Sequence, residues 1–370
     1  MTPVPFFSFA AMNEDLGTAP FDVFRRFWDR QWYILGESVT AFETEYARWN
    51  GTKHCIGVAN GLDALHLALR VLNVGPGDEV IVPSNTYIAT WLAVSQVGAT
   101  IVPVEPHPAT CNLDPARIEA AITPATKVIL PVHLYGQACD MTQIMAVAEK
   151  HRLYVVEDNA QAHGALHAGK MTGSFGHLNA TSFYPTKNLG ALGDAGALTT
   201  DDAALAAQVK LLRNYGSSRK YYNETPGYNS RLDELQAALL SMKLPFLAQW
   251  TAQRRHLARL YQSQLIDLEE ITLPTTSDPA AHVWHQFVVR TTSRDALAAH
   301  LTAQGIGWMI HYPVPPHLQQ AYLSLGYRRG DFPLAEKMAG TSLSLPFFPG
   351  MAEQQVEQVT TVIRQFFRQT

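Results

Sequence analysis

Short β-branched segments alternate with helical segments from about residue 54 to residue 200, and this alternation limits the possible folds more than any other feature. The segments predicted as strands are 54–59, 79–83, 100–104, 127–132, 153–157, 180–184 and 197–200. Leucines at 62, 65, 69 and 72 recur at helical spacing after the first strand. Such alternation predicts an α/β layer built on a mostly parallel sheet.

The pattern changes near Pro245. A long helix is predicted from about 232 to 259, with a kink at the proline, which cannot donate a backbone hydrogen bond. A smaller α+β pattern follows, with a strand at 285–290 and helices at 293–304 and 352–367. We therefore expect a large domain in residues 1–245 and a small C-terminal domain in residues 246–370.

Composition narrows the class of protein. Hydrophobic residues make up 47% and charged residues 16%, as in globular enzymes, and the net charge of −4 argues against a nucleic-acid partner. No apolar run approaches the roughly 20 residues that span a bilayer, and no signal-peptide pattern begins the chain. Three widely spaced cysteines predict a reducing compartment. We expect a cytoplasmic protein that binds neither membrane nor metal, with His282 and His285 packed around Trp284.

Two segments place polar groups at predicted strand ends. Asn60 and Gly61 follow the first strand and begin a helix, whose free amide groups suit a phosphate. Taken alone, this segment is more typical of an ordinary turn. Asp158 follows the strand at 153–157, at the edge where open α/β sheets bind ligands. A helix cap explains Asp158 equally well in isolation, and His163 is best interpreted as a packed, hydrogen-bonded histidine.

A third segment carries Lys187 in a turn rich in proline and glycine, shortly after Ser182. A lysine held and partly desolvated there can act as an amine nucleophile, and Ser182 can donate to a phosphate. Asp158, behind a separate strand, is suited to keeping the ring nitrogen of pyridoxal 5′-phosphate protonated. The glycines fit neither a Rossmann nor a P-loop motif.

A fourth segment interleaves cations, tyrosines and an asparagine, a mixture that suits a diphosphate with an attached ring. These residues are Arg213, Tyr215, Arg219, Lys220, Tyr221, Tyr222, Tyr228, Asn229 and Arg231.

Together these segments resemble the sugar aminotransferases of the DegT/DnrJ/EryC1/StrS family, from about residue 35 to the end. The resemblance rests on residues 60–65, 157–164, 182–190 and 228–231. It implies the type I fold of pyridoxal-phosphate-dependent aminotransferases, a large domain with a mostly parallel sheet and a smaller C-terminal α+β domain.

The resemblance also implies roles for single residues. Lys187 would hold pyridoxal 5′-phosphate as a Schiff base and then carry the proton, and Asp158 would pair with the ring nitrogen. The other expected cofactor contacts are Gly61, Leu62, Tyr87, Gln161, Ser182 and Asn229. Leu62 stands where the family commonly has threonine, so its contact would come from the main chain. Asn229 would reach the cofactor phosphate of a neighbouring subunit, which makes a homodimer with shared active sites the expected active unit.

The segment 311–317 looks like the subgroup that acts on dTDP-linked 3-keto-6-deoxy sugars. The expected sugar contacts are Tyr184, Arg219, Tyr221, His311 and Tyr312. The implied reaction moves the amino group of L-glutamate to the ketone and releases 2-oxoglutarate. A 4-keto-sugar aminotransferase of the same family and a non-catalytic, regulatory protein that binds the cofactor remain alternatives.

Overall fold

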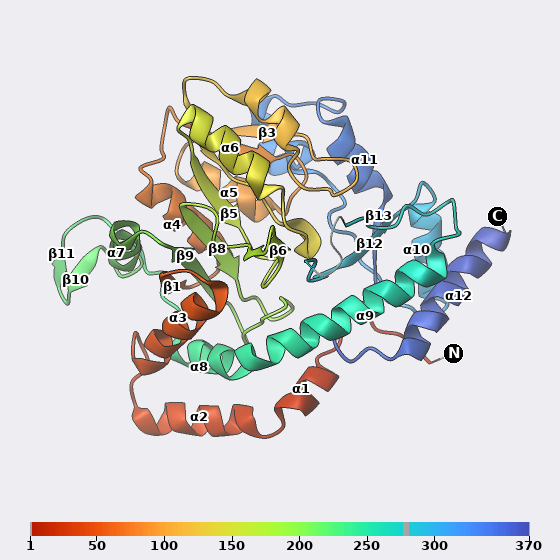
Figure 1. Cartoon of the computed structure of the whole chain (residues 1–370), viewed down its shortest axis with the longest axis horizontal. Coiled ribbons are helices and arrows are strands. Elements are labelled where there is room, and N and C mark those ends of the chain that lie inside the picture. The colour runs from red at the N-terminus through yellow and green to blue at the C-terminus, as the bar shows by residue number, and fades with distance from the viewer. Residues whose placement is uncertain (1, 277–280, 370) are drawn as a thin grey trace.

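A seven-stranded sheet lies at the centre of the computed structural model, which describes residues 2–276 and 281–369 (Figure 1). Its strands follow the order β1-β9-β8-β5-β4-β2-β3. Their bounds are β1 His54–Val58, β2 Glu79–Pro83, β3 Thr100–Val104, β4 Thr126–Ile129, β5 Tyr154–Asp158, β8 Leu178–Ser182 and β9 Gly196–Thr200. The predicted α/β layer is confirmed. All strands except β9 run in one direction, and β9 is antiparallel to both β1 and β8.

Helices cover both faces of this sheet. Consecutive strand residues point to opposite faces, so apolar strands present apolar side chains on both sides, and each side needs a covering layer. One face packs against α4 (Gly61–Val71), α5 (Ile88–Gln96) and α7 (Ala203–Leu212). Val80 and Val82 belong to this layer, whereas Ile81 between them faces α6 (Met141–His151). Near β1 and β9 the second face packs against α3 (Glu37–Asn50) and α8 (Glu234–Lys243). The sheet is therefore buried on both sides, as parallel sheets are.

A nearly continuous helical segment leads from the sheet to the C-terminal part of the chain (Figure 1). It consists of α8, a 3₁₀ turn at Leu244–Phe246 and α9 (Leu247–Leu265). The predicted disturbance at Pro245 is confirmed as this 3₁₀ turn. The predicted end at residue 259 was too early, because the buried Tyr261 and Leu265 continue the apolar stripe beyond it.

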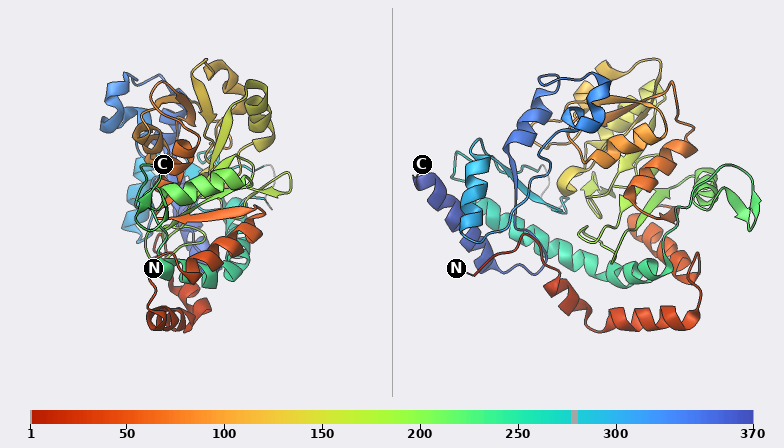
Figure 2. Two further views of the ribbon diagram at one scale, coloured as in Figure 1. Left: turned by 90° about the vertical axis from the view of Figure 1, so that its left-hand side faces the viewer. Right: turned by 180° about the vertical axis from the view of Figure 1, so that it is seen from behind.

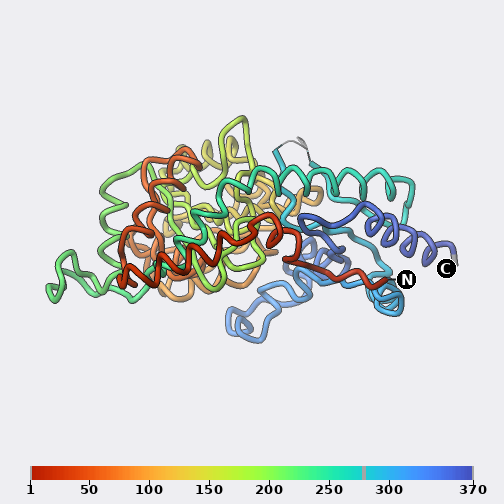
Figure 3. Tube along the Cα trace, turned by 90° about the horizontal axis from the view of Figure 1, so that it is seen from below, coloured from red at the N-terminus to blue at the C-terminus, as the bar shows by residue number. Residues whose placement is uncertain are grey.

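The C-terminal part has a core of its own, formed by α9, α10 (Arg294–Ala303), α12 (Glu353–Gln369) and the pair β12 (Phe287–Arg290) and β13 (Ser342–Leu345). Helix α11 (Pro333–Thr341) precedes β13. Val4, near the N-terminus, also joins this core and pairs with Ile306. The two termini consequently lie at the same end of the molecule (Figure 3). The domain boundary near residue 245 stays a prediction.

The remaining elements lie at the periphery. Helices α1 (Ala10–Leu16) and α2 (Ala19–Arg30) run beneath the body of the molecule, where α2 contacts α8 (Figure 1). A hairpin of β10 (Ser217–Arg219) and β11 (Tyr222–Asn223) projects beyond α7, as the view from behind also shows (Figure 2). A small hairpin joins β6 (Leu166–His167) to β7 (Lys170–Met171). Within the described ranges, no helix combines the length and apolar character needed to cross a membrane.

Candidate active site

One edge of the sheet gathers three of the predicted residues. Asp158 and Ser182 end β5 and β8, and Gly61 follows β1, whose carboxyl end lies at the same edge. A Cβ atom at Gly61 would lie 2.6 Å from the Cβ of Ser182 and 3.2 Å from its Oγ. Only glycine allows this approach, which brings the serine hydroxyl beside the first turn of α4.

The start of α4 is organised to hold an anion. Asn60 caps the helix, since its Oδ1 accepts a hydrogen bond of 2.8 Å from the amide of Asp63. The first amides of a helix have no partner within it, and the helix dipole places partial positive charge there. The amides of Gly61 and Leu62 and the hydroxyl of Ser182 thus form a cradle suited to a phosphate.

Asp158 is 6% exposed and has two hydrogen-bond donors. Thr90 donates through its hydroxyl at 3.0 Å to one carboxylate oxygen, and the amide of Ala160 donates at 3.1 Å to the other. The hydroxyl of Thr86 lies 3.0 Å from that of Thr90. Burial raises the pKa of Asp158, while these donors and the charge of Lys187 act in the opposite direction. The carboxylate is therefore a fixed, desolvated partner for a positive charge.

Lys187 stands in a tight turn after β8. Its amide donates to the carbonyl of Tyr184 at 2.8 Å, and a Cβ atom at Gly190 would lie 2.1 Å from the carbonyl oxygen of Pro185. The turn requires glycine at that point for this reason. Burial lowers the pKa of Lys187 from 10.5 to about 8, although the charge of Asp158 opposes the shift. The lowered pKa consequently makes the neutral, nucleophilic form of this amine more accessible near neutral pH than in an ordinary lysine, although the protonated form still predominates.

Aromatic and amide side chains border the same region. Gln161 accepts from the amide of Tyr135 at 2.6 Å, and its Nε2 donates to the hydroxyl of Tyr312 at 3.0 Å. The rings of Tyr87 and Tyr312 are 5.3 Å apart, and the Tyr87 side chain is more than half exposed. Gln161, Tyr87 and Tyr312 are thus brought together, as a site for a planar ring requires.

Three histidines near Lys187 are neutral. Burial, followed by the charge of Lys187, lowers the pKa of His311 to about 4 and that of His163 to about 3. His311 shares a hydrogen bond of 2.7 Å with the hydroxyl of Ser344. His163 donates through Nε2 to the carbonyl of Ser182 at 2.9 Å, which confirms its interpretation as a packed histidine. Burial also holds the pKa of His285 well below its usual value.

Arg219, Tyr221 and Asn229 are not brought to Lys187 within the chain. Arg219 and Tyr221 lie in the projecting hairpin, where Tyr221 is 85% exposed and Arg219 stacks over Tyr222 at 4.5 Å (Figure 1). Asn229 is exposed at the base of this hairpin and pairs with Asn214. Tyr184, by contrast, belongs to the same turn as Lys187 and is 52% exposed.

Sequence reasoning missed Thr90, Tyr135 and Asn188. Thr90 lies one helical turn after Thr86, close to Tyr87, and this spacing was the available signal for Thr90. The contacts of Tyr135 and Asn188 join segments far apart in the chain, so no local pattern announces them. The expected packing around Trp284 is confirmed for His282, whose ring stacks on it at 3.8 Å, whereas Nδ1 of His285 lies against Asn188.

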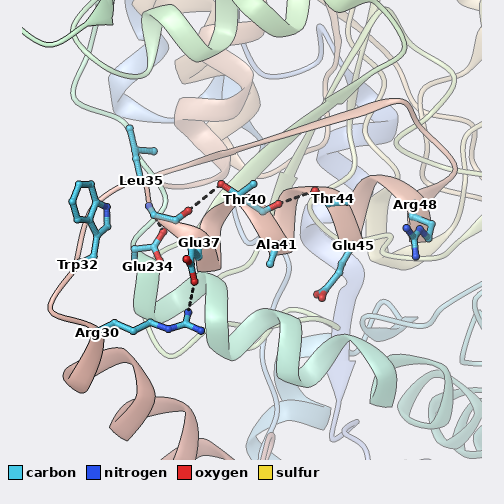
Figure 4. A pocket seen from close by; sticks show the side chains of 11 residues that line it. Arg30, Trp32, Leu35, Glu37, Thr40, Ala41, Thr44, Glu45, Arg48 and Glu234 are labelled. Carbon is cyan, nitrogen blue, oxygen red and sulfur yellow. Dashed lines mark hydrogen bonds and ion pairs between the residues drawn. The ribbon is translucent and has the colours of Figure 1, made fainter.

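A separate hollow of about 1010 Å³ runs along the outer face of α3, between residues 30–36 and Arg48 (Figure 4). Three of its charged side chains have structural roles. Glu234 accepts from the amides of Gly36, Ser38 and Val39, which begin α3. Arg30 pairs with Glu37 at 3.5 Å. This hollow offers no nucleophile or acid–base pair comparable to Lys187 and Asp158.

Comparison with known proteins adds independent information. The sequence profile of the DegT/DnrJ/EryC1/StrS aminotransferase family matches residues 15–364. The chain is 49% identical, over 98% of its length and 96% of the relative, to a dTDP-3-amino-3,4,6-trideoxy-alpha-D-glucose transaminase from Streptomyces venezuelae. It is also 49% identical, over 98% of its length and 99% of the relative, to a dTDP-3-amino-3,6-dideoxy-alpha-D-galactopyranose transaminase from Aneurinibacillus thermoaerophilus.

A solved structure is equally similar. The X-ray structure of S. venezuelae DesV in complex with a ketimine intermediate matches with a TM-score of 0.97 and 48% identity, over 99% of both chains. This similarity confirms the predicted aminotransferase fold.

Proposed function

Because the chain belongs to the DegT/DnrJ/EryC1/StrS aminotransferase family, we propose that it aminates a dTDP-linked 3-keto-6-deoxyhexose, with L-glutamate as the amino donor. The products are the corresponding 3-amino-3,6-dideoxyhexose nucleotide and 2-oxoglutarate. The family match and the named transaminases confirm the predicted enzyme class, a sugar aminotransferase. One observation carries the proposal. Lys187, whose pKa is lowered by burial, lies at the same sheet edge as the buried carboxylate of Asp158 and the anion cradle at Gly61 and Ser182.

The residues at this edge fit pyridoxal 5′-phosphate. The phosphate needs several donors, which Ser182 and the start of α4 supply. The protonated ring nitrogen needs a buried carboxylate, and Asp158 is held by Thr90 and Ala160 for that role. Such a cofactor, when bound, supplies an electron sink that accepts the electrons of the Cα–H bond when the amino donor loses its α-proton.

Lys187 supplies the chemistry of the chain itself. Its buried amine would be the nucleophile that holds the cofactor through the cofactor's aldehyde. When the donor has taken its place, the Lys187 amine would be the acid–base group beside the α-carbon, because burial lowers its pKa to about 8 in this structure. A pKa close to the working pH favours both proton uptake and proton release.

The sugar is proposed to lie between the lysine turn and residues 311–312. Tyr184 and Tyr312 offer ring faces and hydroxyls, and the neutral His311 offers hydrogen bonding without charge. The choice of dTDP and of carbon 3 is supported by the relatives, which are named as transaminases of dTDP-3-amino sugars; a 3-amino sugar is formed from a 3-ketone.

The active unit is proposed to be a homodimer with shared sites. Arg219, Tyr221 and Asn229 stand on or beside a hairpin that projects from the body, as residues would if they completed a neighbour's site (Figures 1 and 2). Mixing Lys187→Ala with Asn229→Ala subunits tests this. Random exchange leaves one intact site in half of the dimers and restores about a quarter of wild-type activity. Recovery of none would contradict shared sites.

The substrate proposal is tested by incubating the protein with cofactor, ¹⁵N-labelled glutamate and a panel of dTDP-3-keto and dTDP-4-keto sugars. NMR of the product is expected to show the label on carbon 3 of the hexose. Label on carbon 4 would instead establish the 4-keto alternative. Cofactor binding without label transfer to any sugar would favour a regulatory protein.

A further inference from the structure

The residue after Lys187 is fixed by two hydrogen bonds from one distant segment. Asn188 is 3% exposed, and its Nδ2 donates to the carbonyl of Val283 at 3.0 Å. Its Oδ1 lies 3.2 Å from Nδ1 of His285. Both polar atoms of the amide are thus used, and both partners belong to the short segment that precedes β12.

The chemistry of these partners defines the protonation of His285. A carbonyl oxygen only accepts, so the NH₂ group of Asn188 must face Val283. Its oxygen then faces His285, whose Nδ1 must carry the hydrogen. Since burial keeps His285 neutral, the ring is held as the Nδ1–H tautomer.

The segment around Val283 and His285 is itself firmly anchored. The amide of Val283 donates to the carbonyl of Gly136 at 3.0 Å, and the amide of His285 donates to that of Tyr135 at 2.9 Å. The buried guanidinium of Arg254 on α9 donates to the carbonyl of His285 at 3.3 Å. The segment therefore has a fixed position from which to hold Asn188.

We propose that Asn188 is a positioning residue, which His285 and Val283 hold so that the turn presents the Lys187 amine to the cofactor aldehyde. The proposal rests on the proposed function, because it assigns that cofactor to Lys187. The side chain of Asn188 is directed to residues 283–285, so it acts through the backbone it shares with Lys187. A lysine that must be freed and recaptured in every cycle needs such a fixed base, because a displacement of about 1 Å costs on the order of 100-fold in rate.

The test separates attachment of the cofactor from binding of the cofactor. Pyridoxal 5′-phosphate, added to the apoprotein, reports attachment to Lys187 through the growth of its visible absorption band. Pyridoxamine 5′-phosphate has no aldehyde and cannot bond to the lysine, so its affinity reports the cradle alone. Asn188→Ala and His285→Leu are each expected to slow attachment about 10- to 100-fold and to leave pyridoxamine 5′-phosphate affinity within about twofold.

Two further variants sharpen the test. His285→Asn can place an NH₂ donor near the former Nδ1 and is expected to restore attachment relative to His285→Leu. Asn50→Ala is a matched control, because Asn50 is a buried asparagine that donates to the carbonyl of Thr172 at 2.9 Å in another part of the fold. It is expected to attach the cofactor at the wild-type rate.

Wild-type attachment rates in Asn188→Ala would overturn the proposal. So would equal losses of attachment and of pyridoxamine 5′-phosphate affinity, or an equal loss in Asn50→Ala, since each indicates general damage. If the wild type attaches the cofactor but aminates no keto-sugar, the proposed function fails and the attachment rates still decide the role of Asn188. A wild type that never attaches the cofactor overturns both.

Discussion

Lys187 is expected to cost the folded apoprotein stability, and the cost can be derived from its pKa. Burial lowers this pKa from 10.5 in the unfolded chain to about 8 in the folded protein. One pKa unit corresponds to about 1.4 kcal/mol, so the charged amine destabilises the folded state by about 3 kcal/mol. Replacement Lys187→Met keeps an unbranched chain and removes the charge, and should stabilise the apoprotein by that order while abolishing transamination.

The pH dependence gives this prediction its sign. Below pH 8 the amine is protonated in both states, so the full cost is present. Between about pH 8 and pH 10.5 the unfolded chain binds a proton that the folded protein does not, and the stability of the wild type rises relative to the variant. Above about pH 10.5 the amine is neutral in both states, so burying it no longer destabilises the folded protein. The advantage of Lys187→Met should therefore be largest at pH 7 and should shrink steadily towards pH 10.

Urea unfolding of both apoproteins at pH 7, 8, 9 and 10 measures this difference. Lys150→Met, at an exposed position, controls for the introduction of a methionine and should change stability by no more than about 0.5 kcal/mol. A Lys187→Met advantage that stays constant from pH 7 to pH 10 would refute the argument, because a gain in apolar packing does not titrate. No advantage at pH 7 would refute it as well.

Substitutions at three further positions test the site and its support. Thr90→Val removes the hydroxyl that donates to Asp158. Hydrogen bonds to charged groups contribute about 1.5–3 kcal/mol, so pyridoxamine 5′-phosphate should bind about tenfold or more weakly in a fluorescence titration. Unchanged affinity would contradict this role of Thr90. Gly61→Ala places a methyl group 2.6 Å from the Cβ of Ser182. Overpacking of this kind costs about 1–3 kcal/mol and should lower the affinity for the cofactor. An affinity equal to that of the wild type would show that the cradle tolerates the methyl group. Glu234→Ala leaves three amides at the start of α3 without their acceptor and should destabilise the protein by about 2–3 kcal/mol in urea unfolding, with KM unchanged. Glu234→Gln should lose less stability, and equal losses of stability in the two variants would contradict a role for the charge.

Local sequence patterns predicted most of the central sheet because each strand is short, apolar and bounded by a turn. They also placed Asp158 correctly at the end of its strand, whereas the strand predicted at 180–184 ends two residues earlier, at Ser182. They did not reveal the direction of β9, because the direction of a strand depends on its neighbours in space. The extension of α9 to Leu265 was missed because its apolar stripe is completed by contacts in the C-terminal core.

The position of three candidate site residues was predictable from local patterns, while their roles stay predictions. Lys187, Asp158 and Gly61 each stand in a local motif, and the fold brings the three motifs to one edge. The supporting contacts were not predictable, because Thr90 and Asn188 hydrogen-bond to partners separated from them by many residues. Their roles become visible only once the segments are packed together.

Lys187 is the residue proposed to carry the cofactor. Reduction of the holoenzyme with borohydride converts the bond between the lysine amine and the cofactor aldehyde into a stable secondary amine, and peptide mass spectrometry then locates the adduct. We predict one phosphopyridoxyl adduct per chain, on the peptide that contains Lys187, and its disappearance when glutamate is added before reduction. An adduct on another lysine, or none on Lys187, would contradict the account.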